Sequence, residues 1–187
     1  MATPPLYPVG LILAGRPVLV VGAGPVGRRK LDQLLACGAV VTVIDPAIDP
    51  EALPTGVTLW RRPYAAGDVD GFRVVIACTN DPATNATVYR EASGAGIAVN
   101  VADDPAHCTF TLPSVVRRGP VTVAVATDGH SPALAKELRD RIATMLDALD
   151  VEGAAASLAS ERTAMQHAGA STESIDWTQR VRQALDR

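Results

Sequence analysis

Aromatic residues are scarce in this chain of 187 residues, in which two Trp, three Tyr and two Phe make up only 4% of the sequence. The core must therefore be built mainly from Val, Leu, Ile and Ala. Such a composition is typical of a parallel sheet covered by helices. Hydrophobic residues make up 48% and charged residues 20%, as in an ordinary globular domain, which argues against a disordered chain.

Cysteine is also rare and widely spaced. Cys37, Cys78 and Cys108 are the only three, and an odd count without C-x-x-C spacing argues against a disulfide framework or a structural zinc site. No apolar run approaches the ~20 residues that span a bilayer. Residues 1–7 lack a basic stretch followed by an apolar one, so no signal peptide is predicted. We therefore expect a cytoplasmic protein with no membrane contact and no metal site.

Positive charge comes almost entirely from arginine, because Lys30 and Lys136 are the only lysines. The net charge of −3 provides no general attraction for nucleic acid or an anionic membrane. Basic residues cluster at 28–30, 61–62 and 117–118. Each cluster is either a solvated face or a local pocket for carboxylate or phosphate groups.

A glycine-rich turn follows the first apolar run. Residues 17–21 (PVLVV) predict a strand, and they lead directly into the sequence GAGPVG at 22–27. Leucines at 31, 34 and 35 predict a helix that ends at Gly38, and residues 40–44 (VVTVI) predict the next strand, closing at Asp45-Pro46. Together these segments predict a β-α-β unit of about the usual ~30 residues.

The spacing Gly22-x-Gly24-x-x-Gly27 is typical of dinucleotide binding. The first glycine permits a tight turn, the second allows the backbone to approach a pyrophosphate, and the third allows the helix to pack on the strand. An acid at the end of the second strand, here Asp45, would accept hydrogen bonds from the adenosine ribose and repel a 2′-phosphate, which favours NAD over NADP. A glycine turn that binds nothing is the alternative. The predicted cofactor-binding residues are Gly22, Gly24, Pro25, Val26, Gly27, Asp45, Pro46, Thr79 and Asn80.

Three further strands are predicted at 57–60, 73–78 and 97–101, with a helix at 82–93 that begins after Asp81. The alternation of strands and helices predicts a Rossmann-like, doubly wound parallel sheet over residues 1–105. Ligands of such sheets bind outside the carboxyl ends of the strands. Asp103 follows a strand there and is a candidate acid/base, although a turn residue or a helix cap is an equally good interpretation.

The pattern changes after Pro105. Alternation at 108–112 and the apolar run at 121–126 predict a small β element, with a turn at 117–120. Ser131-Pro132 predicts the start of a helix whose apolar stripe, ending at Leu149, packs against the domain or against a second subunit. Trp177, Val181 and Leu185 predict a last amphipathic helix.

In sequence, these segments resemble the precorrin-2 dehydrogenase family, the N-terminal module of siroheme synthases. The resemblance covers residues 6–149 and is carried by an ordered series of motifs: YPV at 7–9, GRPVLVVG at 15–22, VGRRKL at 26–31, TNDP at 79–82, NVADDP at 100–105, CTF at 108–110, LPS at 112–114, RGP at 118–120 and SPALA at 131–135.

The resemblance implies NAD-dependent oxidation of precorrin-2 to sirohydrochlorin, and in some relatives insertion of Fe²⁺ to give siroheme. It implies that Asp103 is the catalytic acid/base and that Asn100 and Thr127 lie at the substrate. His130 precedes the Ser131-Pro132 helix start and is a further substrate-binding candidate, with a polar loop histidine as the alternative interpretation. The resemblance also implies a homodimer, so we assign residues 106–149 to a dimerisation and substrate-site segment and residues 150–187 to a helical C-terminal tail.

One departure from the family pattern is Asp128, which stands where relatives often have glycine and adds a carboxylate near the expected substrate site. Arg61-Arg62 and Arg117-Arg118 are candidates for holding substrate carboxylates. The main alternative function is a noncatalytic, NAD-sensing regulatory module. That alternative explains residues 17–101 but gives no reason for the Asn100–Asp103 loop or for Ser131-Pro132. An unrelated short-chain dehydrogenase is disfavoured because Tyr89 lacks a lysine four residues later.

Overall fold

The computed structural model describes residues 5–173 and 175–186. The chain forms two compact units, one spanning Leu6–Thr111 and the other containing Leu112–Arg187. Each unit is described by itself. The division falls six residues after the boundary predicted from the sequence, because the loop after the last strand of the first unit is hydrogen-bonded to that strand.

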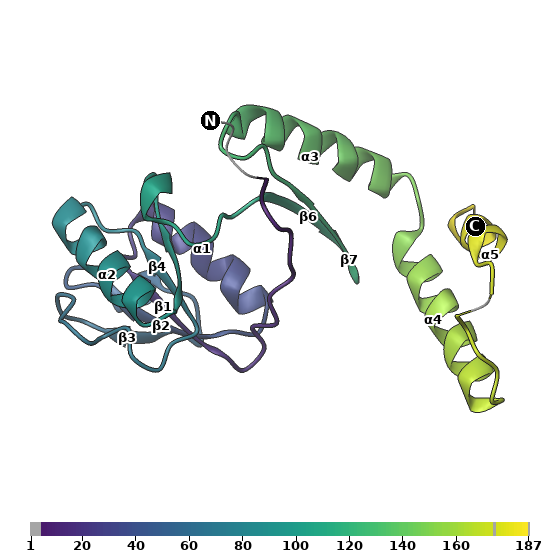
Figure 1. Ribbon diagram of the computed structural model, residues 1–187, viewed down its shortest axis with the longest axis horizontal. Coiled ribbons are helices and arrows are strands. Elements are labelled where there is room, and N and C mark those ends of the chain that lie inside the picture. Colours follow the sequence, from purple (N-terminus) through teal and green to yellow (C-terminus); the bar gives the residue numbers. More distant parts are fainter. Residues whose placement is uncertain (1–4, 174, 187) are drawn as a thin grey trace. The chain divides into compact units, whose positions relative to one another are not determined.

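The first unit is a parallel sheet of five strands in the order β3-β2-β1-β4-β5 (Figure 1). The strands are β1 (Pro17–Val21), β2 (Val40–Ile44), β3 (Thr58–Trp60), β4 (Val74–Ala77) and β5 (Ala98–Val101). Helix α1 (Pro25–Ala36) connects β1 to β2, and helix α2 (Pro82–Gly94) connects β4 to β5. The short 3₁₀ helices η1 (Pro50–Ala52) and η2 (Pro105–His107) lie in loops. The predicted Rossmann-like fold is confirmed.

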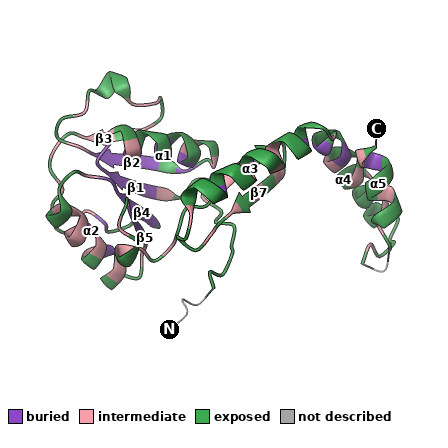
Figure 2. Ribbon diagram, turned by 90° about the horizontal axis from the view of Figure 1, so that it is seen from above, coloured by how far each residue is buried: buried purple, intermediate pink, exposed green. Residues whose placement is uncertain are grey.

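Alternate residues of β1 enter two separate cores, one on each face of the sheet. Val18 and Val20 pack with Leu31 of α1, whereas Leu19 and Val21 pack with Val88 of α2. All six side chains are at most 2% exposed. Figure 2 shows that burial is concentrated in the strands of this sheet. Both faces are thus covered, which is why the strands read as continuous apolar runs.

The open edge of β5 is covered by side chains of the loop that follows it. Thr109 accepts a hydrogen bond from Val99 N through its hydroxyl (2.8 Å) and donates its own N–H to Val99 O (2.8 Å). The Cys108 thiol lies 3.3 Å from Val101 N and 3.4 Å from Val101 O. The predicted strand at 108–112 is therefore wrong, because Cys108 and Thr109 bond to the edge of β5 through their side chains.

The second unit contains the antiparallel pair β6 (Ser114–Arg118) and β7 (Val121–Val125), followed by helices α3 (Pro132–Asp147), α4 (Val151–His167) and α5 (Thr178–Leu185). Arg117 and Arg118 lie at the end of β6, so the predicted turn at 117–120 is confined to Gly119 and Pro120. Val116, Leu146 and Val151 form the buried core of this unit. Ser131 caps α3 by accepting a hydrogen bond from Leu134 N, as predicted.

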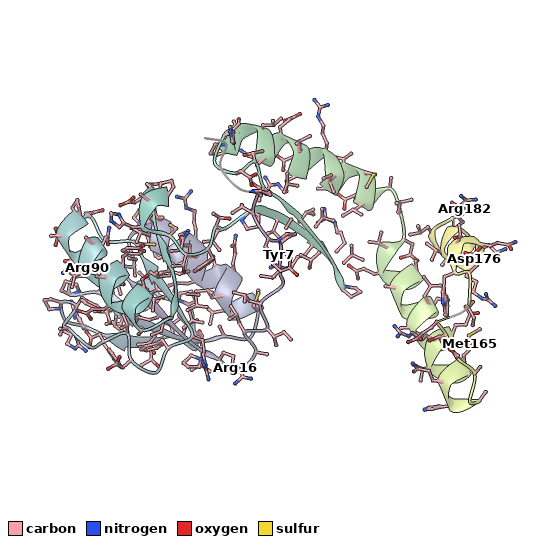
Figure 3. All side chains as sticks on the ribbon, viewed as in Figure 1. Tyr7, Arg16, Arg90, Met165, Asp176 and Arg182 are labelled. Carbon is pink, nitrogen blue, oxygen red and sulfur yellow. The ribbon has the colours of Figure 1, made fainter. Side chains whose placement is uncertain are left out.

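Apolar side chains remain exposed in both units. On α3, Leu134 is 50% and Met145 56% exposed. In the first unit, the extended segment before β1 exposes Ile12 (85%) and Tyr7 (88%, labelled in Figure 3).

Candidate cofactor-binding and active site

The sharp turn between β1 and α1 requires glycine at two positions. Gly22 has a φ of +89°, and a Cβ added there would lie 2.8 Å from backbone atoms of Cys78 and Thr79. A Cβ on Gly27 would lie 2.3 Å from the carbonyl oxygen of Gly22. These two glycines are therefore needed for the close packing of β1, β4 and α1.

Gly24 has no such packing role. Its φ of −62° and ψ of −172° suit ordinary residues, and an added Cβ would meet no described atom within 4 Å. Gly24 is the N-cap of α1, and within the described chain no side chain caps this helix. The first N–H groups of α1 therefore face an open cradle that suits an anionic group such as a pyrophosphate.

Asp45 connects the end of β2 to the glycine turn. Its carboxylate accepts hydrogen bonds from Ala23 N (2.8 Å), Ala47 N (2.8 Å) and Ile48 N (2.9 Å). Partial burial acts to raise the pKa of this carboxyl, but the three backbone donors outweigh burial and lower it. Asp45 is thus a fixed anion whose oxygens hold the glycine turn in place beside the expected ribose position.

A hollow of about 480 Å³ lies at the carboxyl ends of β1, β2 and β4. Six of the predicted cofactor-binding residues line it: Gly22, Gly24, Asp45, Pro46, Thr79 and Asn80. Pro25, Val26 and Gly27 belong to the first turn of α1 and are not among its lining residues. Ala47, Pro63, Tyr64, Cys78, Asp81 and Thr84 also line the hollow. Its residues and open N–H groups fit a dinucleotide such as NAD.

Tyr64 is a lining residue that the sequence prediction missed. Its hydroxyl donates to Glu91 Oε2 on α2 (2.6 Å), and Gly67 N donates to the same oxygen (2.9 Å). Burial, followed by this bond to the glutamate, raises the pKa of Tyr64 well above its usual range, so the phenol stays protonated. No local sequence signal marks Tyr64, because only the path of the chain after β3 brings it to the hollow.

The loop after β4 is held by hydrogen bonds from side chains at the start of α2. The Thr79 hydroxyl donates to Asn85 Oδ1 (2.7 Å), and the Asn85 amide donates back to Thr79 O (3.1 Å). Asp81 caps α2 by accepting hydrogen bonds from Ala83 N and Thr84 N, as predicted. Thr79 therefore presents a fixed surface to the hollow, and Asn80, which is exposed, follows it.

Asp103 lies in the turn directly after β5, at the same edge of the sheet. Its φ is +59°, which is uncommon for a residue other than glycine. Ala102 N donates to Ala77 O (2.9 Å), so the turn starts beside the end of β4. Burial raises the pKa of the Cys78 thiol to about 11; Lys30 opposes that shift, and the negative charge of Asp103 adds to it. Asp103 is therefore electrostatically close to a residue that lines the hollow.

Asn100, predicted to lie at the substrate, is a buried residue of β5, and its place at the substrate stays a prediction. Its side chain is only 8% exposed, and its amide nitrogen donates to Phe110 O (3.1 Å) and to the Cys108 thiol (3.3 Å). The amide thus holds the loop that follows Asp103. We propose that Asn100 affects the substrate through the shape of this loop.

Thr127 and His130 belong to the second unit, in the turn before α3. The Thr127 hydroxyl donates to Ser131 O (3.0 Å) and accepts from Ser131 N (3.2 Å). The exposed ring of His130 lies with Nδ1 3.0 Å from Thr127 O. Asp128 between them has a φ of +48°, a conformation that glycine adopts more readily than other residues. Placing Thr127 and His130 at the substrate remains a proposal.

Two of the arginines considered for substrate carboxylates are already paired. Arg62 donates to both oxygens of Asp68 (2.6 and 2.7 Å) and lies over the ring of Trp60. Arg118 forms an ion pair with Asp147 on α3. Binding of substrate carboxylates by either guanidinium would therefore have to compete with an existing ion pair.

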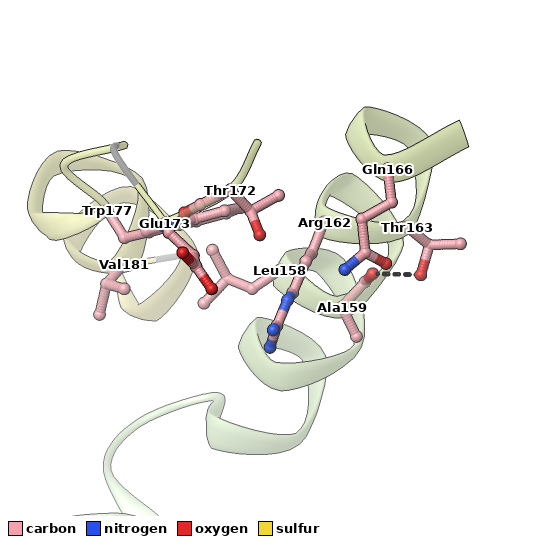
Figure 4. Close-up of a pocket in the computed structure, with 9 residues that line it drawn as sticks. All are labelled: Leu158, Ala159, Arg162, Thr163, Gln166, Thr172, Glu173, Trp177 and Val181. Atoms are coloured by element: carbon pink, nitrogen blue, oxygen red, sulfur yellow. Dashed lines mark hydrogen bonds between the residues drawn. The ribbon is translucent and has the colours of Figure 1, made fainter. Parts of the chain in front are cut away.

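A second hollow, of about 720 Å³, lies between α4 and α5 (Figure 4). Leu158, Trp177 and Val181 form its apolar part, and Arg162, Gln166 and Glu173 add polar groups. The hollow lacks a strand end and a glycine turn, so we place the candidate site in the first unit. Over residues 5–173 and 175–186, no group of three or more His, Cys, Asp or Glu side chains could hold a metal ion, and no helix is long and apolar enough to cross a membrane.

Comparisons with known proteins agree with this geometry. The family model described as putative NAD(P)-binding matches residues 9–114, and the model described as sirohaem biosynthesis protein central matches residues 118–145. The siroheme synthase of Methylococcus capsulatus is 46% identical over 143 residues, which are 74% of this chain and 30% of that protein. Siroheme synthase 1 of Aeromonas salmonicida is 41% identical over 143 residues, 74% of this chain and 31% of that protein.

The chain thus spans about a third of the length of these relatives. Among solved structures, SirC, a precorrin-2 dehydrogenase, has a TM-score of 0.62 and 29% sequence identity, and the match covers 74% of this chain and 70% of that one. The resemblance predicted from the motifs is confirmed. With more than half of its residues matched by one family model, the chain belongs to the putative NAD(P)-binding family.

Proposed function

We propose that the chain is an NAD-dependent precorrin-2 dehydrogenase that produces sirohydrochlorin. The observation that carries the proposal is the position of Asp103. This carboxylate lies in the turn after β5, the strand next to β4, and β4 leads directly into Cys78, which lines the hollow behind the glycine turn. A candidate acid/base and a dinucleotide cradle thus share one edge of the sheet. The similarity to siroheme synthases and to SirC supports the same reaction.

The reaction removes one hydride and one proton from the substrate, so atoms and charge balance as precorrin-2 and NAD⁺ give sirohydrochlorin, NADH and H⁺. When bound, NAD⁺ would accept the hydride. The free N–H groups of α1 would bind its pyrophosphate, and Asp45 would face the ribose. Asp103 would accept the proton, for which its exposed position at the sheet edge leaves access. The remaining task of the chain is to hold the substrate ring against the cofactor.

Fe²⁺ insertion is a further proposal, in which iron is a substrate. It would require removal of two pyrrole protons, and Asp103 could accept them without a permanent metal site. Supplying sirohydrochlorin and Fe²⁺ without NAD, and following the absorption change, tests this activity separately.

We also propose that residues 106–149 form a homodimer contact and complete the substrate site with Thr127 and His130. The exposed apolar residues of α3, Leu134, Leu138 and Met145, support a contact with a second copy. Sedimentation of the purified chain measures this association directly. Residues 150–187 are proposed as a helical appendage of the same unit, because Leu185 and Val151 pack in its core.

The decisive experiment compares NADH production from precorrin-2 by the wild type, by Asp103→Asn and by Asp70→Asn. Asp70 is an exposed aspartate of the same unit that does not line the hollow. Loss of the proton acceptor should lower kcat roughly 10²- to 10³-fold, whereas Asp70→Asn should leave it unchanged. NAD affinity should stay within about twofold in both variants. A wild type that binds NAD but produces no NADH would instead be the NAD-sensing module.

A further inference from the structure

A second polar pair stands in the loop that carries Asp103. His107, the last residue of η2, has its Nδ1 2.6 Å from Asp104 Oδ2. The backbone closes the same small ring, since His107 N donates to Asp104 O (3.1 Å). Asp104, the residue next to the proposed acid/base, is therefore held by both the main chain and the side chain of His107.

The imidazole is also fixed from the other side. Its ring meets Tyr89 of α2 edge to face, with ring centroids 4.8 Å apart and planes at 71°. Helix α2 is firmly capped by Asp81 and packs on the sheet through Val88 and Ala92. His107 thus connects the turn at 102–104 to a rigid helix, so movement of Asp104 would require breaking either the polar or the aromatic contact.

This connection matters because Asp103 has a left-handed backbone conformation, which few residues other than glycine adopt, although aspartate is among those that tolerate it. Its φ of +59° is maintained between Ala102, bonded to Ala77 on one side, and Asp104 on the other. The Cys108 thiol adds a further contact, lying 3.2 Å from Asp104 O. An uncommon conformation persists only where its surroundings hold it.

The two neighbouring carboxylates differ in their partners. Asp104 is engaged by His107, whereas the carboxylate of Asp103 makes no hydrogen bond or ion pair with any residue that the structure describes. A ligand that binds the Asp103 carboxylate therefore has no described protein partner to displace. We propose that His107 is a positioning residue, which fixes the turn through Asp104 and so directs the Asp103 carboxylate toward the substrate. This inference rests on the proposed dehydrogenase function.

Two substitutions separate the polar contact from the aromatic one. His107→Phe keeps a ring against Tyr89 but loses the donor to Asp104. His107→Asn keeps an N–H near the position of Nδ1 but loses the ring. For both variants we would measure kcat, KM for precorrin-2, KM for NAD and melting temperature. We would also measure amide hydrogen exchange of residues 101–108.

We expect His107→Phe to lower kcat about tenfold and to speed exchange at 101–108, with KM for NAD and melting temperature unchanged. His107→Asn should recover at least half of the wild-type kcat. A wild-type kcat in His107→Phe, or a loss that His107→Asn does not recover, overturns the proposal. If the wild type itself shows no turnover, the proposed function fails, and amide hydrogen exchange at residues 101–108 alone decides whether His107 fixes the turn. Faster exchange in His107→Phe than in His107→Asn supports this role of His107, and equal exchange rates refute it.

Discussion

Replacing Gly24 by alanine should separate cofactor binding from stability. A Cβ at this position meets no described atom within 4 Å, and φ is −62°, so the folded chain accepts the methyl group. Alanine restricts the unfolded chain more than glycine does, which raises the free energy of unfolding by about 0.4–1 kcal/mol. Loss of glycine at an N-cap lowers the free energy of unfolding by roughly 0.5–1 kcal/mol. The free energy of unfolding should therefore change by less than about 1 kcal/mol.

Binding should respond much more strongly. The added methyl group would occupy the side of the turn where a pyrophosphate approaches the N–H groups of α1. Loss of one charge-assisted hydrogen bond costs about 1.5–3 kcal/mol, which corresponds to a Kd for NAD raised roughly 10- to 100-fold. Calorimetric titration with NAD measures the affinity, and urea denaturation of the same sample measures the stability.

Gly10→Ala is the matched control, because a Cβ there also meets no described atom within 4 Å and the residue lies outside the hollow. It should leave both NAD affinity and stability near wild type. If Gly24→Ala bound NAD within threefold of the wild type, the pyrophosphate would not rest on this turn. If its affinity and stability fell together, the inference that Gly24 has no packing role would be wrong.

Two further variants test the anions that hold the loops of the first unit. Asp45→Ala leaves the buried N–H of Ala23 without its acceptor and should lower the free energy of unfolding, measured by urea denaturation, by about 1–3 kcal/mol. The control Asp49→Ala frees only the exposed N–H of Glu51 and should lower it by less than about 1 kcal/mol. Equal losses in the two variants would contradict the assigned role of Asp45. The hydrogen bond from Arg62 lowers the pKa of Asp68, so the charged form contributes stability at neutral pH that is lost as the pH falls below about 4. Asp68→Asn should flatten that acid-side decrease in the free energy of unfolding, and an unchanged pH profile would refute the coupling.

Much of the first unit could be predicted from sequence because its signals are local. The run at 17–21 is a strand because each of its last four residues is buried between two helix-covered faces. The helix start after Asp81 follows from a side-chain cap that acts within three residues. The strand predicted at 108–112 is wrong because an alternating pattern indicates how polarity varies along the chain, but does not indicate which groups the side chains bond to. Thr109 and Cys108 bond to β5 instead of forming a strand.

In the candidate site, too, the residues with a local sequence signal were predicted and those placed by distant contacts were not. Gly22, Gly24 and Asp45 were predicted because the chemistry of a dinucleotide turn fixes their spacing, and the structure places all three on the hollow. Tyr64 was missed because its place depends on Glu91, 27 residues further along the chain. The direction of the Asn100 amide could not be predicted either, since it depends on Phe110 and Cys108 reaching back across the loop.

The hydroxyl of Thr109 and the thiol of Cys108 have a consequence beyond local geometry. Val99 and Val101 lie on β5, the last strand of the sheet order, where backbone groups could template pairing with another chain. Because Thr109 and Cys108 already bond to both the N–H and the C=O of these two residues, an incoming strand would have to displace them. The segment that presents Asp103 to solvent thus also protects the protein from edge-to-edge aggregation.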